Sequence, residues 1–517
     1  MIAHKSYLLT DTKNVNKAEL RLTLAITFLL SLVLSLSQVL VDPVVNSDGI
    51  LYLHTASLIQ TDHWQAAYSA YNWLFYPFLI AHFSSITSLS LEYSAYSINA
   101  FFSATTCAVF VLITHEFGGK NKVILFFASL IILCFPNFNE YRNMVIRDHG
   151  YWALYLLSCY FFIRAFKHPS PKVFIYLTST LLIASLFRVE GVIFLITLIP
   201  ILFFHHKPTH TKTIICIASL VIITLLAVLP FNNTQKVSTL DGFTKIKQIS
   251  QSIERPVNKI PTAIKITIEY INELSPQGFS ENYAPAILSI TVILILLTEV
   301  LSALSPLYAI ALSFEFFRQK TMLGSPLFKP WVYLISINLI VLCGFLISSF
   351  FLSGRYPIAL TLTLLTPLPF LAFQVYQKTQ SMRLSSRQKL IVQIIAFSFI
   401  ALSIDGLIST GASKGYLRDA GQWIGALNKK PGASLFTNDQ FVSFYANSQT
   451  SKRIHEPTFD TVLRKIRTGE LQKFDLLAIQ LSRKEIHEET VLLNALAVKP
   501  TKVFKNSRGD RILIFKQ

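Results

Sequence analysis

The chain has 517 residues, of which 52% are hydrophobic and 14% are charged. Several apolar runs are long enough to cross about 30 Å of hydrocarbon, which indicates an α-helical polytopic membrane protein. The net charge of +18 would suggest a nucleic-acid partner in a soluble domain, but much of it lies in short loops between apolar runs, where it sets membrane orientation. No nucleic-acid partner is predicted.

The first predicted element is a membrane span over residues 22–40. Lys13, Lys17 and Arg21 precede it and no convincing cleavage site follows, so the segment is predicted to remain as a signal anchor. About eleven spans are predicted in all. They lie near residues 22–40, 94–114, 122–135, 149–166, 173–187, 190–204, 213–230, 285–316, 331–352, 357–376 and 390–408.

The flanking charges decide how the run 285–316 is counted, since it could hold two short helices or one helix bent at Pro306. With one helix there, the short loops rich in Lys and Arg all lie on the side of the N-terminus, which is the positive-inside pattern. We therefore predict a multi-pass membrane protein with a cytoplasmic N-terminus. The segments predicted to face the periplasm or exterior are the loops 41–93, 136–148, 187–190, 231–284 and 353–356 and the C-terminal segment from about residue 411.

The first periplasmic loop carries the most informative residue. From Val41 to Tyr93 the chain contains no Lys or Arg, and Asp48 lies early in this stretch. A carboxylate at a membrane surface is hard to explain by packing, so Asp48 is a candidate catalytic residue. It could also cap a short helix lying on the membrane. The many Trp and Tyr residues of this loop could stack on a bound ligand or simply anchor such helices at the headgroup level.

Three further turns on the same side place charges at predicted helix ends. They contain Arg147 and Asp148, Arg188 and Glu190, and Arg355 followed by Tyr356. Charges at a hydrocarbon boundary are unfavourable unless they are paired or hydrated, which makes these residues functional candidates. Structural alternatives exist for each: arginines can extend to lipid headgroups, Asp148 could cap its helix, and Glu190 could pair with Arg188 or cap the next span.

From about residue 411 the apolar density falls, and a periplasmic α/β domain is predicted over 411–517 behind a membrane domain over 1–410. Its predicted elements are strands at 434–437 and 475–479, a helix at 458–468, and a hairpin of 503–505 with 511–515 that turns at 507–510. In the loop 231–284, helical spacing broken by Pro256 and Pro261 predicts one or two helices on the membrane, which could form a lid over a bound substrate or a mere connection.

Taken together, these motifs resemble the GT-C superfamily of polytopic glycosyltransferases. The nearest branches are similar to protein O-mannosyltransferases, lipid A aminoarabinose transferases and RgtA/B/C/D-like sugar transferases. The resemblance covers residues 1–210, with the Arg355-Tyr356-Pro357 turn as a further match. Its motifs are Ser47-Asp48-Gly49 followed by Tyr52, Tyr71-Asn72-Trp73 followed by Tyr76-Pro77, Arg147-Asp148, and Arg188 followed by Glu190-Gly191.

The resemblance implies an activity and roles for these residues. Members of the superfamily transfer a sugar from a polyprenyl phosphate carrier to an acceptor hydroxyl at the outer face of the membrane. Asp48 would be the general base of an inverting transfer, with Asp148 in a supporting catalytic role. The departing phosphate would be stabilised by arginines. These are, in order of preference, Arg355, Arg188 and Arg147, with Glu190, Tyr356 and Tyr52 in support.

The expected partners are the polyprenyl-phosphate-linked sugar donor, an acceptor that is an envelope lipid, a glycan or a protein, and the bilayer itself. Lipid A, core oligosaccharide or another envelope glycan is preferred over protein as acceptor. No cofactor is predicted to be required. Two carboxylates with phosphate oxygens could hold Mg²⁺ or Mn²⁺, but the chain has no compact Asp-x-Asp motif that favours a metal.

Two other classes share the membrane composition. A transporter or flippase would carry its charges near the bilayer midplane, often between inverted repeats, whereas here the charges gather at one surface. A polymerase or ligase of surface polysaccharide would use the same carrier lipids, but its large loop is expected late in the chain. The acidic loop here is the first, which favours a glycosyltransferase.

Overall fold

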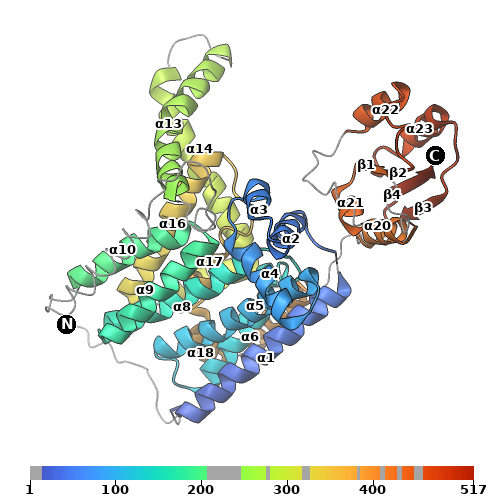
Figure 1. The fold of residues 1–517 in the computed structure, drawn as a ribbon. Coiled ribbons are helices and arrows are strands. Elements are labelled where there is room, and N and C mark those ends of the chain that lie inside the picture. Colours follow the sequence, from blue (N-terminus) through green and yellow to red (C-terminus); the bar gives the residue numbers. More distant parts are fainter. Residues whose placement is uncertain are drawn as a thin grey trace, which may run out of the picture. The chain divides into compact units, whose positions relative to one another are not determined.

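A computed structural model (Figure 1) describes residues 14–42, 44–205, 246–274, 280–316, 327–380, 385–407, 414–427, 434–446 and 458–517. The predicted span 213–230 and the start of the loop 231–284 lie outside these residues. By packing, the chain divides into two compact units. The first unit comprises Met1–Leu34, Asn99–Tyr141 and Arg147–Leu407, and the second comprises Ser35–Ile98, Arg142–Ile146 and Ile408–Gln517. The predicted domain boundary near residue 411 stays a prediction.

The described part of the first unit is helical throughout. Two long helices, α1 (Lys17–Val41) and α5 (Leu91–Glu116), belong partly to each unit. The other helices of the first unit are α6 (Lys122–Leu133), α7 (Pro136–Asn139), α8 (Asp148–Lys167), α9 (Pro171–Phe187), α10 (Glu190–His205), α13 (Ile246–Leu274), α14 (Ser280–Leu304), α15 (Pro306–Phe314), α16 (Phe328–Ser349), α17 (Ile358–Leu364), α18 (Leu368–Gln380) and α19 (Ser386–Asp405).

Length and composition make several of these helices able to cross a membrane. Among the described residues, six segments of at least 18 residues qualify. Three shorter apolar helices, α6, α9 and α10, fall below that length. The six are Lys17–Val41, Leu91–Glu116, Tyr283–Leu304, Phe328–Ser349, Ile358–Gln380 and Ser386–Asp405. The protein is thus a mostly helical chain with several membrane-spanning segments, as predicted, while the count of about eleven stays a prediction.

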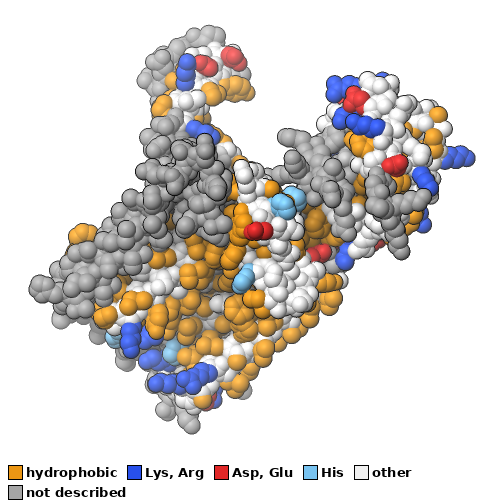
Figure 2. All heavy atoms as spheres, viewed as in Figure 1, with side chains coloured by type: hydrophobic (Ala, Val, Ile, Leu, Met, Phe, Trp, Pro, Cys, Tyr) orange, Lys and Arg blue, Asp and Glu red, His pale blue; other side chains and the backbone are white. Residues whose placement is uncertain are grey.

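Hydrophobic side chains gather on the visible surface of the first unit over α1 and its neighbouring helices (Figure 2). Leu29 on α1, Phe126 on α6 and Ile394 on α19 are each more than half exposed. A soluble protein rarely exposes apolar patches of this extent. The exposed faces are therefore the surfaces that contact lipid.

Proline positions explain where the helices differ from the predicted spans. The run 285–316 was predicted as one helix bent at Pro306, which is wrong: α14 ends at Leu304 and α15 begins at Pro306. Pro306 cannot donate a backbone hydrogen bond, and Ser305 adopts a left-handed φ of 65°. Conversely, α13 runs continuously past Pro256 and Pro261, which the sequence predicted to break it.

The first loop of the second unit folds into three helices, in agreement with the short helices predicted for it. They are α2 (Ser47–Gln60), α3 (Trp64–Ala70) and α4 (Phe75–Thr87). Helices α2 and α4 pack on one another, and the rings of Tyr52, Tyr71 and Tyr76 meet edge to face, with Tyr52 centred 5.2 Å from each of the others. The aromatic side chains of this loop thus form a packed core between its helices.

The C-terminal segment of the second unit contains a four-stranded sheet in the order β1-β2-β4-β3. Strand β1 (Leu435–Thr437) pairs in parallel with β2 (Leu476–Leu481), while β4 (Arg511–Lys516) runs antiparallel to both β2 and β3 (Lys502–Lys505). The described helices are α20 (Gly415–Leu427), α21 (Gln440–Tyr445), α22 (Phe459–Arg467) and α23 (Glu489–Leu496). The predicted strands, hairpin and helix are confirmed to within two residues at each end.

The core of this sheet gives a prediction for stability. Leu477 on β2 is fully buried among Val462, Leu492 and Leu513. Leu477→Ala removes apolar contacts and leaves a cavity, which is expected to lower the free energy of unfolding by about 2–5 kcal/mol. Hydrogen exchange of the full-length protein in detergent would measure this as faster exchange across β2 and β4. Val503→Ala on β3, at a side chain 41% exposed, is the control and should change exchange little.

Candidate active site

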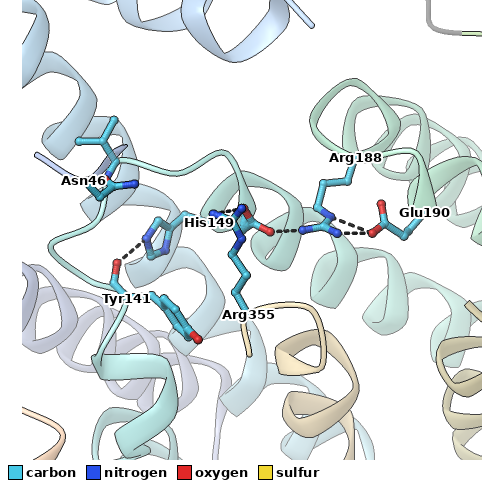
Figure 3. Close-up of polar contacts among 8 residues, drawn as sticks. Asn46, Tyr141, His149, Arg188, Glu190 and Arg355 are labelled. Atoms are coloured by element: carbon cyan, nitrogen blue, oxygen red, sulfur yellow. Dashed lines mark hydrogen bonds and ion pairs between the residues drawn. The ribbon is translucent and has the colours of Figure 1, made fainter. Parts of the chain in front are cut away.

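A buried arginine links two carboxylates in the first unit (Figure 3). Arg188 donates through Nη1 to Oδ1 of Asp148, and through Nε and Nη2 to Oε1 of Glu190, with an Nε–Oε1 distance of 2.9 Å. All three side chains are at most 8% exposed. The planar guanidinium fork can serve both carboxylates at once, which the single ammonium of a lysine cannot do in the same geometry.

Helix ends bring these three residues together. Asp148 is the first residue of α8, Arg188 is the extended residue that follows α9, and Glu190 is the first residue of α10. The start of α8 lies directly on Phe187, since a Cβ on Gly150 would come within 2.2 Å of the Phe187 ring. Only glycine permits this approach, which lets the neighbouring Arg188 reach Asp148. Both carboxylates also lie in the first turn of a helix, where the helix dipole favours negative charge.

A second arginine lies beside this network. Arg355, in the turn between α16 and α17, has its Nη1 3.9 Å from Oδ2 of Asp148, and its side chain is 23% exposed. Tyr356 follows it, and the Arg188 guanidinium carbon lies 4.4 Å from the centre of the Tyr356 ring. Arg147 precedes Asp148 and acts on the same carboxylate electrostatically. The four helix ends thus gather three arginines around two acids.

The three arginines of this cluster differ in burial and in their distance from the carboxylates. Arg188 is buried and held by both acids, so its positive charge is compensated within the protein. Arg355 lies beyond hydrogen-bond distance of Asp148 and is partly exposed, and the side chain of Arg147 is also not fully buried. The cluster therefore places three guanidinium groups around two carboxylates. A cluster of this composition can attract an anionic group, and Arg355 has a partly exposed side chain that could donate to it.

His149 has a structural role next to this cluster. Its Nε2 donates to the carbonyl oxygen of Tyr141 over 2.9 Å (Figure 3). Its Nδ1 therefore accepts from the Ser103 hydroxyl over 3.0 Å. The ring is completely buried. These contacts fix the turn before α8 to the helix itself. Among the described residues, no group of three or more His, Cys, Asp or Glu side chains is arranged to hold a metal ion.

Asp48 belongs to the second unit, in the first turn of α2. The alternative that Asp48 caps this helix is wrong, because Asn46 is the N-cap residue and the helix begins at Ser47. The Asp48 side chain is partly exposed, and its negative charge is favoured by the helix dipole at this end. Tyr52 lies one turn further along α2, where its ring is buried against Tyr71 and Tyr76.

The structure therefore brings together most of the predicted residues of the first unit. Asp148, Arg188, Glu190, Arg355 and Tyr356 are in contact, and the alternative that Glu190 pairs with Arg188 is confirmed. Asp48 and Tyr52 lie in the second unit and are described by themselves. The sequence reasoning missed Tyr151, whose ring centre lies 5.7 Å from the Arg188 guanidinium carbon. Its position one turn after Asp148 on the same helix is the signal that could have identified it.

Comparison with solved structures gives several matches, among them two structures of one protein. No family model matches the chain, and no curated protein does. Both structures are of ArnT from Cupriavidus metallidurans, an aminoarabinose lipid A transferase of the GT-C superfamily that the motifs resemble. The apo form is 10% identical with a TM-score of 0.38, covering 96% of this chain and 98% of ArnT. The form bound to undecaprenyl phosphate is 12% identical with a TM-score of 0.37, covering 97% and 98%. At these TM-scores no residue role is transferred.

The buried network predicts a large loss of stability when Arg188 is removed. Arg188→Met leaves two buried carboxylates without their shared cation, which is expected to lower the free energy of unfolding by about 3–5 kcal/mol. Thermal unfolding of the purified protein in detergent would show a clear drop in Tm. The control is Lys265→Met, which removes an exposed pair with Glu269 on α13 and should change stability by less than about 1 kcal/mol. Equal drops in the two variants would contradict this account of the network.

Proposed function

We propose that this protein is an inverting glycosyltransferase that moves a sugar from a polyprenyl-phosphate-linked donor to a hydroxyl of an envelope lipid or glycan at the outer face of the inner membrane. The observation that carries the proposal is the cluster of three arginines and two acids at the ends of α8, α9, α10 and α16. It combines arginine side chains, burial and a location in a chain with membrane-spanning segments. A phosphate on a long lipid is the substrate that needs all three.

The arginines are suited to the leaving group. When the anomeric C–O bond to phosphate breaks, the polyprenyl phosphate gains negative charge, and fixed cations stabilise that charge in the transition state. Arg355 is better placed than Arg188 to bind it, since the Arg355 side chain is 23% exposed, whereas Arg188 is buried and held by both acids. Arg188 would then hold Asp148 and Glu190 in place, and Asp148 would in turn orient Arg355. Asp148 therefore has a supporting role in this scheme.

Asp48 is proposed as the general base. The acceptor oxygen would attack the anomeric carbon from the side opposite the phosphate while its proton passes to the Asp48 carboxylate, and the sugar–phosphate bond breaks with inversion. What supports this role is local: a partly exposed carboxylate at the start of α2, in a loop without Lys or Arg. No metal is included in this scheme, and the need for Mg²⁺ or Mn²⁺ stays open to test.

The position of the charges favours an enzyme over a transporter. Asp148 and Glu190 are the first residues of their helices, Arg188 follows the end of α9, and Arg355 lies between two helices. Helix α16 is one of the candidate membrane spans, and Arg355 lies beyond its C-terminal end. A transporter of the usual kind carries its substrate-binding charges near the bilayer midplane.

The role of Asp48 can be tested by substitution. Asp48→Asn removes the proton acceptor without changing the side-chain shape, and it is expected to lower the transfer rate by about 10²–10⁴-fold. The rate is measured by mass spectrometry as the sugar mass restored to envelope lipids and glycans of deletion cells that express the variant. Asp62→Asn, in the same loop at a residue with φ of 60° that asparagine tolerates, should restore the product as wild type does. If Asp48→Asn restored the product fully, Asp48 could not be the general base.

The role of Arg355 predicts a different defect. Arg355→Ala is expected to weaken the use of the phosphate-linked donor, so that product forms slowly at normal donor levels and the lipid-linked sugar accumulates. Arg164→Ala serves as the control, because Arg164 contacts the Tyr160 hydroxyl near the other end of α8. Both variants are compared by mass spectrometry of donor and product. A normal donor-to-product ratio in folded Arg355→Ala would contradict phosphate binding by this residue.

A further inference from the structure

The start of α2, which carries Asp48, is held by a tyrosine from the C-terminal segment. The backbone N–H of Val45 donates to the Tyr445 hydroxyl over 3.0 Å, in a buried contact between residues 400 positions apart. Val45 itself is completely buried. A buried N–H without an acceptor would destabilise this turn, so the Tyr445 oxygen supplies a hydrogen bond that the local chain does not. All of these residues lie in the second unit.

A second contact reaches the same helix end from the same element. Gln440, the first residue of α21, donates from Nε2 to the Ser47 hydroxyl over 3.1 Å. Ser47 is the first residue of α2 and the immediate neighbour of Asp48. Helix α21 thus contacts the chain at Val45, just before α2, and at Ser47, the first residue of α2. Asp48 follows directly after these two contacts.

The segment 142–146 fixes α2 through two further contacts. Asn46 is the N-cap residue, but its side chain makes no cap hydrogen bond to α2, and its Oδ1 accepts from the Val145 N–H over 2.7 Å. A Cβ on Gly49 would lie 2.8 Å from the Val145 side chain, so the two backbones approach as closely as glycine allows. The four residues from Val45 to Asp48 therefore have little freedom to move.

Tyr445 is itself rigidly placed. It is the last residue of α21, which packs on α20, and the Arg418 guanidinium carbon of α20 lies 5.7 Å from its ring centre. Asp439 caps α21 by accepting from the Val442 N–H over 2.8 Å. Burial, followed by the nearby charge of Glu92, raises the pKa of Tyr445 to about 12. The hydroxyl therefore keeps its proton across the physiological range and accepts from Val45 as a neutral group.

We propose that Tyr445 is a positioning residue for Asp48: the C-terminal segment, through Tyr445 and with Gln440, sets the position of the proposed base. This inference rests on the proposed function, because it concerns the transfer reaction. A base must hold its carboxylate within a fraction of an ångström of the productive geometry, and errors of about 1 Å can cost 10²-fold in rate. The C-terminal segment is then part of the catalytic apparatus without contacting the reacting atoms.

The test is Tyr445→Phe, which deletes one oxygen and keeps the ring. The matched control is Tyr416→Phe on α20, which deletes a hydroxyl that accepts from Gln480 Nε2 over 3.3 Å. Both tyrosines are less than 10% exposed. Burial raises the pKa of each to about 12. Each full-length variant is expressed in deletion cells, its folded amount is measured, and the product is assayed per folded protein in isolated membranes by mass spectrometry.

Tyr445→Phe is expected to form product about tenfold more slowly and to shift the acidic limb of the pH–rate profile, which reports protonation of the base. Tyr416→Phe should keep both the rate and the profile. In an Asp48→Glu background, where the carboxylate is already displaced, Tyr445→Phe should cost clearly less than tenfold, because the two changes act on one group.

Two results would overturn the inference: equal rates for the two tyrosine variants, or a loss in Tyr445→Phe that multiplies with Asp48→Glu and leaves the pH profile unchanged. The second pattern is that of a purely structural residue. The failure of the proposed base is separately visible, since Asp48→Asn would then transfer sugar at the wild-type rate. If Asp48→Asn were inactive and Tyr445→Phe fully active, the role of Asp48 as base would stand and only the positioning role of Tyr445 would be contradicted.

Discussion

Burial of the Arg188 guanidinium between Asp148 and Glu190 is the interaction on which the first unit depends. Three charged groups that are almost fully buried are stable only because each compensates another, and the three residues come from the ends of α8, α9 and α10. The network therefore fixes the relative positions of these helix ends. It also compensates the charge of Arg188 within the protein, whereas Arg355, on the neighbouring turn, has a more exposed side chain.

The second unit follows a similar logic with neutral groups. Helix α2 begins at a point where hydrogen bonds come from two distant segments, α21 and residues 142–146, and not from a side-chain cap of its own. A helix start fixed in this way is more rigid than one capped locally, because its geometry is determined by packed elements. This is the property that a proton-accepting side chain on that helix requires.

The sequence predicted the membrane class, most helix positions and the C-terminal strands, because apolar periodicity and turn residues are local signals. It also indicated Asp148, Arg188, Glu190 and Arg355 as charges at helix ends. It could not predict that Asp148 and Arg188 form an ion pair, since they are 40 residues apart and their contact depends on Gly150 admitting the Phe187 ring. The contact of Tyr445 with Val45 is even less accessible, because nothing in either segment encodes the other. The break at Ser305 and the continuity of α13 were missed because a proline in an apolar run can either end a helix, as Pro306 begins a new one, or lie within it, as Pro256 and Pro261 do.

The most direct test of the central claim is mass spectrometry of envelope lipids and glycans from cells that lack this protein, compared with the same cells carrying the wild-type gene. If the protein is a polyprenyl-phosphate-dependent transferase, we expect one hexose, pentose or amino-sugar mass to disappear from an acceptor in the deletion while the matching lipid-linked sugar accumulates. Both should return to normal on complementation. Identical acceptor and carrier-lipid spectra in the two strains would contradict the assignment of this protein as a glycosyltransferase.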